Sequence, residues 1–264
     1  MKNGRQIVTN FITLFFLFII FTFSSYALAQ TTRPTLQSLQ NQINCLTTPI
    51  VTKHLQAIDH GWYNNRGQSR ADSTHGVVAY IVGKSTFQDI TSVYRNFFVF
   101  DLRSILPENY PAPFSRRVEV IVARLIPYNP AIGYKNDSGD TLTYVLNRVK
   151  NINSLIDGTG GLPAFTDLAD GPIYGSYVAS VNNNNKAEPI HFNHTAVYDI
   201  NRILRFGAEE DDYRFAVGGV IVGLDDSAND QFLFGGSGED QFIRTLELYI
   251  KYPDALCPEP DLLP

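Results

Sequence analysis

Acidic side chains gather in three short segments of this sequence: residues 136–140, 209–212 and 225–230. In the first segment, oxygen-bearing side chains stand at alternating positions around Gly139, which resembles half of a calcium-binding loop. The rest of that loop pattern, with its closing Glu, is missing. We predict a structural Ca²⁺ ion held by acidic residues from these segments: Asp137, Asp140, Asp225, Asp226 and Asp230. Solvated turns are the alternative, because Asp, Asn, Ser and Gly are the residues that turns prefer.

Trp62, the single tryptophan of the chain, follows Gly61 and precedes Tyr63. Two adjacent aromatic side chains on the surface of a β-sandwich can stack on the apolar face of a sugar ring. We therefore predict that Trp62 and Tyr63 bind a carbohydrate ligand. The alternative is that this tryptophan fills the core at the start of a β-domain.

The sequence contains no set of residues typical of an enzyme active site. The motif Gly-x-Ser-x-Gly of a nucleophilic serine is absent, and no cysteine or carboxylate spacing completes a zinc site with His191 and His194. Paired carboxylates such as Asp101 and Glu247 can cleave glycans when they meet in space. We instead expect Asp101 to cap a turn after its strand and Glu247 to face outward, and we predict a non-catalytic protein.

The chain carries a formal charge of −5, from 21 Lys and Arg residues against 26 Asp and Glu residues. This balance provides no basic field to hold a phosphate backbone, so we expect no nucleic-acid partner. A hydrophobic fraction of 44% with 18% charged residues fits a folded domain and excludes a disordered chain.

Residues 1–29 have the three parts of a secretory signal peptide. Lys2 and Arg5 give a positive start, residues 11–23 form an almost unbroken apolar run, and residues 27–29 are a small-x-small cleavage site. The apolar run is shorter than the ~20 residues that a membrane-spanning helix needs, and no later segment is long and apolar enough. We predict a secreted protein, extracellular or periplasmic, with no transmembrane segment once the signal is removed.

Export favours a disulfide between the two cysteines, Cys45 and Cys257, which lie near the two ends of the mature chain. The bridge would join an N-terminal lead-in, residues 30–60, to a C-terminal tail, residues 253–264. One domain, residues 61–252, lies between them. Closing so long a loop contributes about 4 to 5 kcal/mol in the chain-entropy account of disulfides.

Within this domain the apolar pattern has a period of two, which is typical of β-strands. We expect strands over nine ranges: residues 77–82, 95–102, 118–125, 141–147, 173–181, 190–192, 215–222, 231–234 and 244–251. Two short helices are expected, at residues 152–156 and from a cap at Asn193 or Thr195 to about Leu204. This pattern predicts an all-β fold in which two antiparallel sheets pack face to face, as in a jelly roll.

Alternation within the strands predicts which side chains are buried. Residues 118–125 alternate with almost no break, and in residues 244–251 the apolar positions face one side while Glu247 and Lys251 face the other. The expected core includes the following residues: Phe98, Phe100, Leu102, Val120, Val122, Val217, Leu246, Leu248 and Ile250.

The run from Arg95 to Leu102, preceded by residues 80–83, resembles the YIVG and YRNFFVFDL signature of a family of exported bacterial β-sandwich proteins. Further similarity follows in order at residues 165–168, 171–175, 215–219, 232–235 and 244–248. Many members of that family carry a PEP-CTERM sorting tail, and the domain is similar to jelly-roll modules of bacterial surfaces. This chain departs from that tail, because residues 258–260 are not followed by a membrane helix. The resemblance implies a β-sandwich and carries no established activity.

Together these features predict a secreted or cell-surface-associated protein that binds an extracellular polysaccharide or another cell-surface component, or that acts as a matrix component. A purely structural or protein-binding surface module is the first alternative. A glycan-active enzyme is the second, and it would require a polar cleft with perturbed acidic or histidine side chains.

Overall fold

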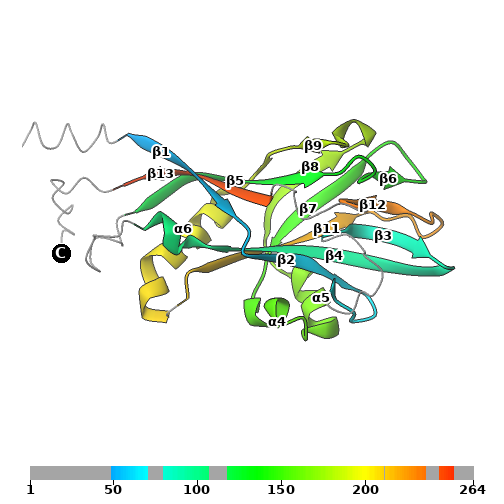
Figure 1. The fold of residues 1–264 in the computed structure, drawn as a ribbon, viewed down its shortest axis with the longest axis horizontal. Helices are drawn as coiled ribbons and strands as arrows, with labels where there is room; N and C mark the ends of the chain where they lie inside the picture. The colour runs from blue at the N-terminus through cyan, green and yellow to red at the C-terminus, as the bar shows by residue number, and fades with distance from the viewer. Residues whose placement is uncertain (1–48, 71–79, 107–117, 211, 236–243, 253–264) are drawn as a thin grey trace, which may run out of the picture. The chain divides into compact units, whose positions relative to one another are not determined.

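The computed structural model describes residues 49–70, 80–106, 118–210, 212–235 and 244–252. Most of these residues form strands that belong to two sheets, and every strand pairing among them is antiparallel (Figure 1). The predicted all-β fold of two antiparallel sheets is therefore confirmed.

The smaller sheet contains five strands. In order they are β1 (Ile50–Gln56), β13 (Arg244–Lys251), β5 (Glu119–Asn129) and β10 (Ile190–His191), with β9 (Lys186–Ala187) also paired to β5. All seven residues of β1 pair with β13. The sandwich therefore includes Ile50, which lies ahead of the boundary expected at residue 61.

The larger sheet contains eight strands. In order they are β6 (Lys135–Asn136), β12 (Gln231–Leu233), β3 (Val82–Phe87), β4 (Ile90–Asp101), β11 (Arg214–Val222), β7 (Leu142–Arg148) and β8 (Ile173–Ala179), while β2 (Asp59–Asn64) pairs with β4. The first part of β4 pairs with β3 and its second part with β2, whereas β11 lies along its other side. This long strand thus holds three neighbours in place.

Three α-helices lie among the described residues: α4 (Ile152–Ile156), α5 (Gly161–Asp170) and α6 (His194–Glu210). The single turn of α4 matches the prediction. The Asn193 side chain caps α6, because its Oδ1 accepts hydrogen bonds from the backbone N–H groups of Thr195 (3.0 Å) and Ala196 (3.2 Å). The helix continues beyond Leu204, where we expected it to end.

Helix α5 was not predicted. It begins in a Gly-rich stretch without a side-chain cap, so the local pattern indicates a turn rather than a helix. Tertiary contacts hold it instead: Arg95 of β4 donates to the Phe165 carbonyl (2.7 Å), and its guanidinium lies 4.0 Å from the centre of the Phe165 ring. Ala164 and Leu168 form the buried face of α5.

The core has two parts, one on each face of the larger sheet. Between the two sheets, and under α6, lie Phe98 and Phe100 of β4 with the apolar residues of the neighbouring strands. On the opposite face, Phe97 and Val99 pack beneath α4 and α5 (Figure 1). Eight predicted core residues are buried: Phe98, Phe100, Leu102, Val120, Val217, Leu246, Leu248 and Ile250.

Val122 is the predicted core residue that the structure places outside. The register of β5 against β13 shifts by one residue, since Ile250 pairs with Val120 and Tyr249 with Val122. Ile121 is therefore an extra residue in β5, and this β-bulge reverses the alternation beyond it. Val120 is 1% exposed, Val122 is 40% exposed, and Ala123 takes the next buried position.

Truncating the two valines on either side of the bulge should lower the free energy of unfolding by very different amounts. Val120→Ala removes methyl groups from the core and should lower the free energy of unfolding by about 2 kcal/mol, whereas Val122→Ala should lower it by less than about 1 kcal/mol. Chemical denaturation of both variants measures the difference. Equal losses would mean that the alternation continues through residue 121 without a bulge.

Glu247 points away from the core as predicted, but the prediction that it is exposed is wrong. The Glu247 side chain lies on the face of β13 opposite Leu246 and Leu248, but it is only 6% exposed because neighbouring side chains cover it. Arg124 of β5 donates to one carboxylate oxygen, and His54 Nε2 lies 2.8 Å from the other. The hydrogen bond from Arg124 is the main cause that lowers the pKa of Glu247 to about 2.

Glu247 should make the protein sensitive to acid. Because the folded pKa is lowered, its contribution is complete above the unfolded value near 4.5 and is lost as the pH falls toward 2. The gap in unfolding free energy between the wild type and Glu247→Gln should therefore be largest near neutral pH and should shrink over that range.

Chemical denaturation at several pH values measures this gap. Glu119→Gln, which changes an exposed carboxylate of the same sheet, serves as the control and should alter stability little at any pH. A gap for Glu247→Gln that stays constant from neutral pH to pH 2 would contradict the proposed ion-pair role.

Candidate functional site

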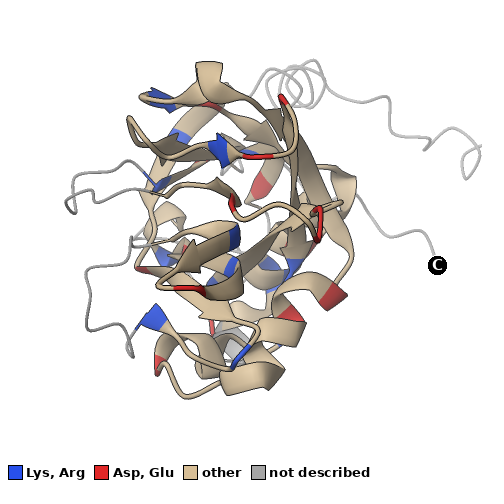
Figure 2. Ribbon diagram, turned by 90° about the vertical axis from the view of Figure 1, so that its right-hand side faces the viewer, with Lys and Arg blue, Asp and Glu red and all other residues tan. Residues whose placement is uncertain are grey.

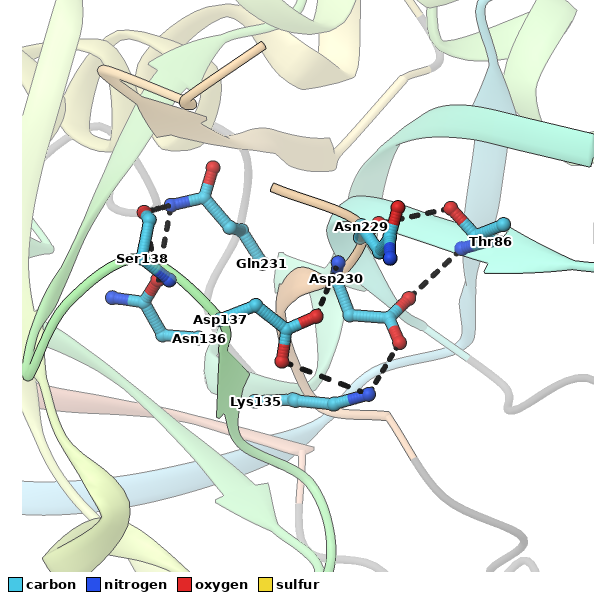
Figure 3. A network of polar contacts seen from close by, with 8 residues as sticks. All are labelled: Thr86, Lys135, Asn136, Asp137, Ser138, Asn229, Asp230 and Gln231. Carbon is cyan, nitrogen blue, oxygen red and sulfur yellow. Dashed lines mark hydrogen bonds and ion pairs between the residues drawn. The ribbon is translucent and has the colours of Figure 1, made fainter. Parts of the chain in front are cut away.

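Two of the predicted acidic segments meet where β6 pairs with β12. Asp230 accepts hydrogen bonds from the backbone N–H of Thr86 (2.8 Å) and from Lys135 Nζ (2.5 Å), as Figure 3 shows. Asp137 Oδ2 accepts from the backbone N–H of Asp230 (3.0 Å), and its other oxygen lies 3.8 Å from the same lysine nitrogen. The Lys135 ammonium therefore lies against both carboxylates.

Two other predicted ligands, Asp225 and Asp140, take part in hydrogen bonds of the turns. Asp225 Oδ1 accepts from the backbone N–H (2.8 Å) and the hydroxyl (2.7 Å) of Ser227, which is the usual way an Asp closes a turn. Asp140 contributes its backbone carbonyl, which accepts from the Tyr134 hydroxyl (2.8 Å). Gln231 ties the two loops together by donating to Asn136 (3.0 Å) and Ser138 (2.8 Å).

These contacts bear directly on the predicted Ca²⁺ site. Of the five predicted ligands, Asp137 and Asp230 are brought together, and the Lys135 ammonium offsets one of their two negative charges. The described part of the chain contains no group of three or more His, Cys, Asp or Glu side chains placed to hold a metal ion. The two loops are thus held by hydrogen bonds of the kind that turns make, and the Ca²⁺ site stays a prediction.

The predicted aromatic pair lies beside a cavity of about 280 Å³, which we call the β2 pocket. It is formed by β2, by the segment that follows β2, and by the C-terminal end of α4. Its lining includes Asp59, His60, Trp62, Tyr63, Arg70 and Asp157.

Trp62 and Tyr63 do not form the exposed platform that we predicted. Trp62 is 4% exposed and packs edge-on against Tyr94, with ring centres 5.1 Å apart. Tyr63 is fully buried on the other face of β2, and its hydroxyl donates to the carbonyl of Ser154 in α4 (2.7 Å). The two rings form no shared platform because adjacent residues of a strand point to opposite faces. Both are buried and both also line the β2 pocket.

The polar wall of the β2 pocket centres on His60. Burial, followed by the guanidinium groups of Arg244 and Arg70, lowers the pKa of His60 to about 3, so its imidazole is neutral at physiological pH. Arg70 Nη1 lies 3.2 Å from His60 Nε2 and donates to the His60 carbonyl (3.1 Å). Burial also raises the pKa of the neighbouring Asp59. Hydrogen-bond donors and acceptors thus lie beside aromatic rings in one cavity.

A second cavity, of about 250 Å³, opens between α6 and the strands β7, β8 and β11, and we call it the α6 pocket. Charged side chains dominate its lining: Arg148, Lys150, Asp199, Arg202, Asp212 and Arg214. We did not predict this site, because its members come from segments far apart in the sequence and no local spacing joins them. Elsewhere on the ribbon, basic and acidic residues are interspersed (Figure 2).

Asp101 and Glu247, the carboxylates considered for glycan cleavage, are each bound in a separate ion pair. Asp101 caps the 3₁₀ turn η2 (Leu102–Ile105) by accepting from the backbone N–H of Arg103 (2.9 Å), as predicted, and it also pairs with the Arg103 side chain. Glu247 is held by Arg124 and His54. Neither carboxylate lines either pocket.

Other predictions lie outside the described residues, namely the signal peptide at residues 1–29, the tail at 253–264 and the bridge between Cys45 and Cys257. In the part of the chain that the structure describes, no helix has the length and apolar character to cross a membrane. No known protein family matches the sequence, and no curated protein matches it.

The two possible roles of Trp62 predict different effects on stability. Its indole N–H is buried and has no hydrogen-bond partner among the described residues, so Trp62→Phe removes an unsatisfied donor while keeping an aromatic ring. Trp62→Ala removes the ring and should cost about 3 to 5 kcal/mol of unfolding free energy, whereas Trp62→Phe should cost clearly less. Equal, small losses for both variants, measured by chemical denaturation, would mean that Trp62 is not a core residue.

Proposed function

We propose that this chain is an exported, non-catalytic β-sandwich protein that binds an extracellular polysaccharide through the β2 pocket. The proposal joins the signal-peptide pattern of the sequence to the chemistry of this cavity. Polysaccharides present hydroxyl groups around rings whose faces are apolar, so their binding sites combine aromatic walls with a few hydrogen-bonding groups.

The observation that carries the proposal is the composition of the β2 pocket. Trp62 and Tyr63 supply aromatic wall, while Arg70 and Asp157 supply hydrogen-bonding groups. The ring nitrogens of His60 already lie against the guanidinium groups of Arg244 and Arg70. An arginine can donate to several oxygens at once. Arg70 and Asp157 are exposed members of this lining.

The size of the cavity limits what can enter. At about 280 Å³ it lies just below the range of ~300–1,000 Å³ typical of pockets that enclose a drug-sized ligand. A short part of a glycan, such as a chain end or one ring, therefore suits it better than an extended segment. The rest of the polysaccharide would lie across the adjoining surface.

The β2 pocket contains the perturbed side chains that a glycan-active enzyme would require, since the pKa of Asp59 is raised and that of His60 is lowered. We propose binding rather than hydrolysis because the carboxylates already have hydrogen-bond or ion-pair partners. Asp101 and Glu247 are committed to arginine and histidine partners, as described above. In the β2 pocket Asp59 accepts a hydrogen bond from the backbone N–H of His60 (2.7 Å), and Asp157 accepts one from Thr159 (2.9 Å). The two carboxylates of the β2 pocket, Asp59 and Asp157, thus each accept a hydrogen bond from a backbone N–H close in sequence.

The experiment is a panel of immobilised polysaccharides, including exopolysaccharide of the source cells, probed with the purified exported protein in calcium and again in chelator. We expect selective retention on at least one polysaccharide. Arg70→Gln should weaken that binding about tenfold or more, because it removes a charged hydrogen-bond donor.

Arg66→Gln is the matched control, since Arg66 is an exposed arginine that precedes Arg70 and does not line the pocket. It should bind like the wild type. A folded protein that binds no polysaccharide in either buffer would overturn the proposed function. Equal losses for Arg70→Gln and Arg66→Gln would overturn its assignment to the β2 pocket.

A further inference from the structure

The α6 pocket is a positively charged cavity in a chain whose overall charge is −5. Four basic side chains line it, at Arg148, Lys150, Arg202 and Arg214, against two acidic ones at Asp199 and Asp212. They come from the end of β7, from α6 and from the start of β11, so the fold brings together charges that the sequence keeps apart. A concave site with an excess of one charge attracts ligands of the opposite charge.

Some of these charges are already paired. Arg214 and Asp212 form a two-pronged pair, with Nε–Oδ1 and Nη2–Oδ2 distances of 2.8 Å each. Lys150 Nζ donates to Asp170 Oδ2 (3.2 Å), which lies outside the lining of the pocket. These pairs leave Arg148 and Arg202 as the guanidinium groups that face Asp199.

Asp199 accepts no hydrogen bond from Arg148 or Arg202. Its Oδ2 accepts a short hydrogen bond from the Tyr174 hydroxyl (2.7 Å), and Arg148 Nε lies 3.7 Å from the same oxygen, beyond hydrogen-bond distance. Arg202 is exposed and makes no hydrogen bond or ion pair with any described residue. The donors of two guanidinium groups are therefore available at this cavity.

We propose that the α6 pocket binds the carboxylate of an acidic sugar unit, a uronic acid of a polysaccharide, through Arg148 and Arg202. This inference rests on the proposed function, since it names an acidic polysaccharide as the ligand class and adds a second contact point. A guanidinium matches a carboxylate by donating two parallel hydrogen bonds.

The remaining charge of the pocket fits a carboxylate better than a phosphate. With the two acidic lining residues and Asp170 counted against the four basic ones, a single positive charge is left. One carboxylate neutralises that charge, whereas a phosphate monoester with up to two negative charges would exceed it. Apolar lining from Ile152, Ile203 and Phe215 suits the C–H face of a sugar ring.

The test measures binding of a short oligogalacturonate to the exported protein by calorimetry, with the carboxyl-reduced oligosaccharide of the same length as the matched ligand. We expect binding of the acidic form and a loss of about tenfold or more for the reduced form. Arg202→Gln and Arg148→Gln should each weaken binding of the acidic form by a similar factor. Raising the salt concentration should weaken it further, because the pocket opens to solvent.

Arg205→Gln is the control variant, because Arg205 is exposed on the same helix and does not line the pocket. It should bind the acidic oligosaccharide like the wild type. Equal binding of the acidic and reduced forms, no binding of either, or an equal loss for Arg205→Gln would each overturn the proposal. Tighter binding of poly-glutamate than of oligogalacturonate would also overturn it and would indicate an acidic protein partner.

The two proposals fail in different ways. Arg70→Gln tests the β2 pocket, whereas Arg148→Gln and Arg202→Gln, compared with Arg205→Gln, test the α6 pocket. Selective polysaccharide binding that Arg70→Gln abolishes and Arg202→Gln leaves intact would overturn the α6 pocket alone. Loss of all polysaccharide binding in the folded wild type would overturn the proposed function itself.

Discussion

The burial of β4 on both faces is the constraint on which the rest of the structure depends. Phe98 and Phe100 point into the core between the sheets, while Phe97 and Val99 point the other way, and all four are buried. A strand that is apolar on both faces must be covered on both, because each exposed large side chain would forfeit about 1.5 to 3 kcal/mol of hydrophobic stabilisation. The smaller sheet with α6 covers one face, and α4 with α5 covers the other.

Buried polar groups along this strand are satisfied within the sheet. Asn96 is fully buried, donating to the Tyr80 carbonyl (3.0 Å) and accepting from the Tyr144 hydroxyl (2.8 Å). Gly219 of β11 makes this contact possible, since a Cβ there would lie 2.1 Å from both Asn96 Oδ1 and Tyr144 Oη. The contact fixes the side chains of Asn96 in β4 and Tyr144 in β7 across the intervening β11, because an unsatisfied amide in this position is costly.

Both pockets follow from the way the helices cover the strands. The β2 pocket lies where the end of α4 meets β2, and the α6 pocket lies where α6 meets the ends of β7, β8 and β11. In each place polar side chains line a cavity between a helix and neighbouring strands. At the loops that we predicted to bind calcium, Lys135 lies against Asp137 and Asp230, and these contacts join the two loops beside the pairing of β6 with β12.

Local pattern in the sequence was sufficient for the fold class, most strands, the single turn of α4 and the Asn193 cap, because these depend on neighbouring residues. The sequence also correctly places eight core residues, since alternation along a regular strand gives the buried face. It could not reveal the bulge at Ile121, because the extra residue is defined only by the partner strand. That single irregularity moves Val122 from the predicted core to the surface.

The candidate sites depended on the tertiary structure for the same reason. Glu247 is buried because Arg124 and His54 on neighbouring strands contact it. Helix α5 is held by contacts with β4, which cannot be predicted from the residues of the helix alone. The sequence identified Trp62 and Tyr63 but not the face to which each points, and it gave no sign of the α6 pocket. Local periodicity determines elements, whereas sites arise from side chains that meet only when distant segments pack together.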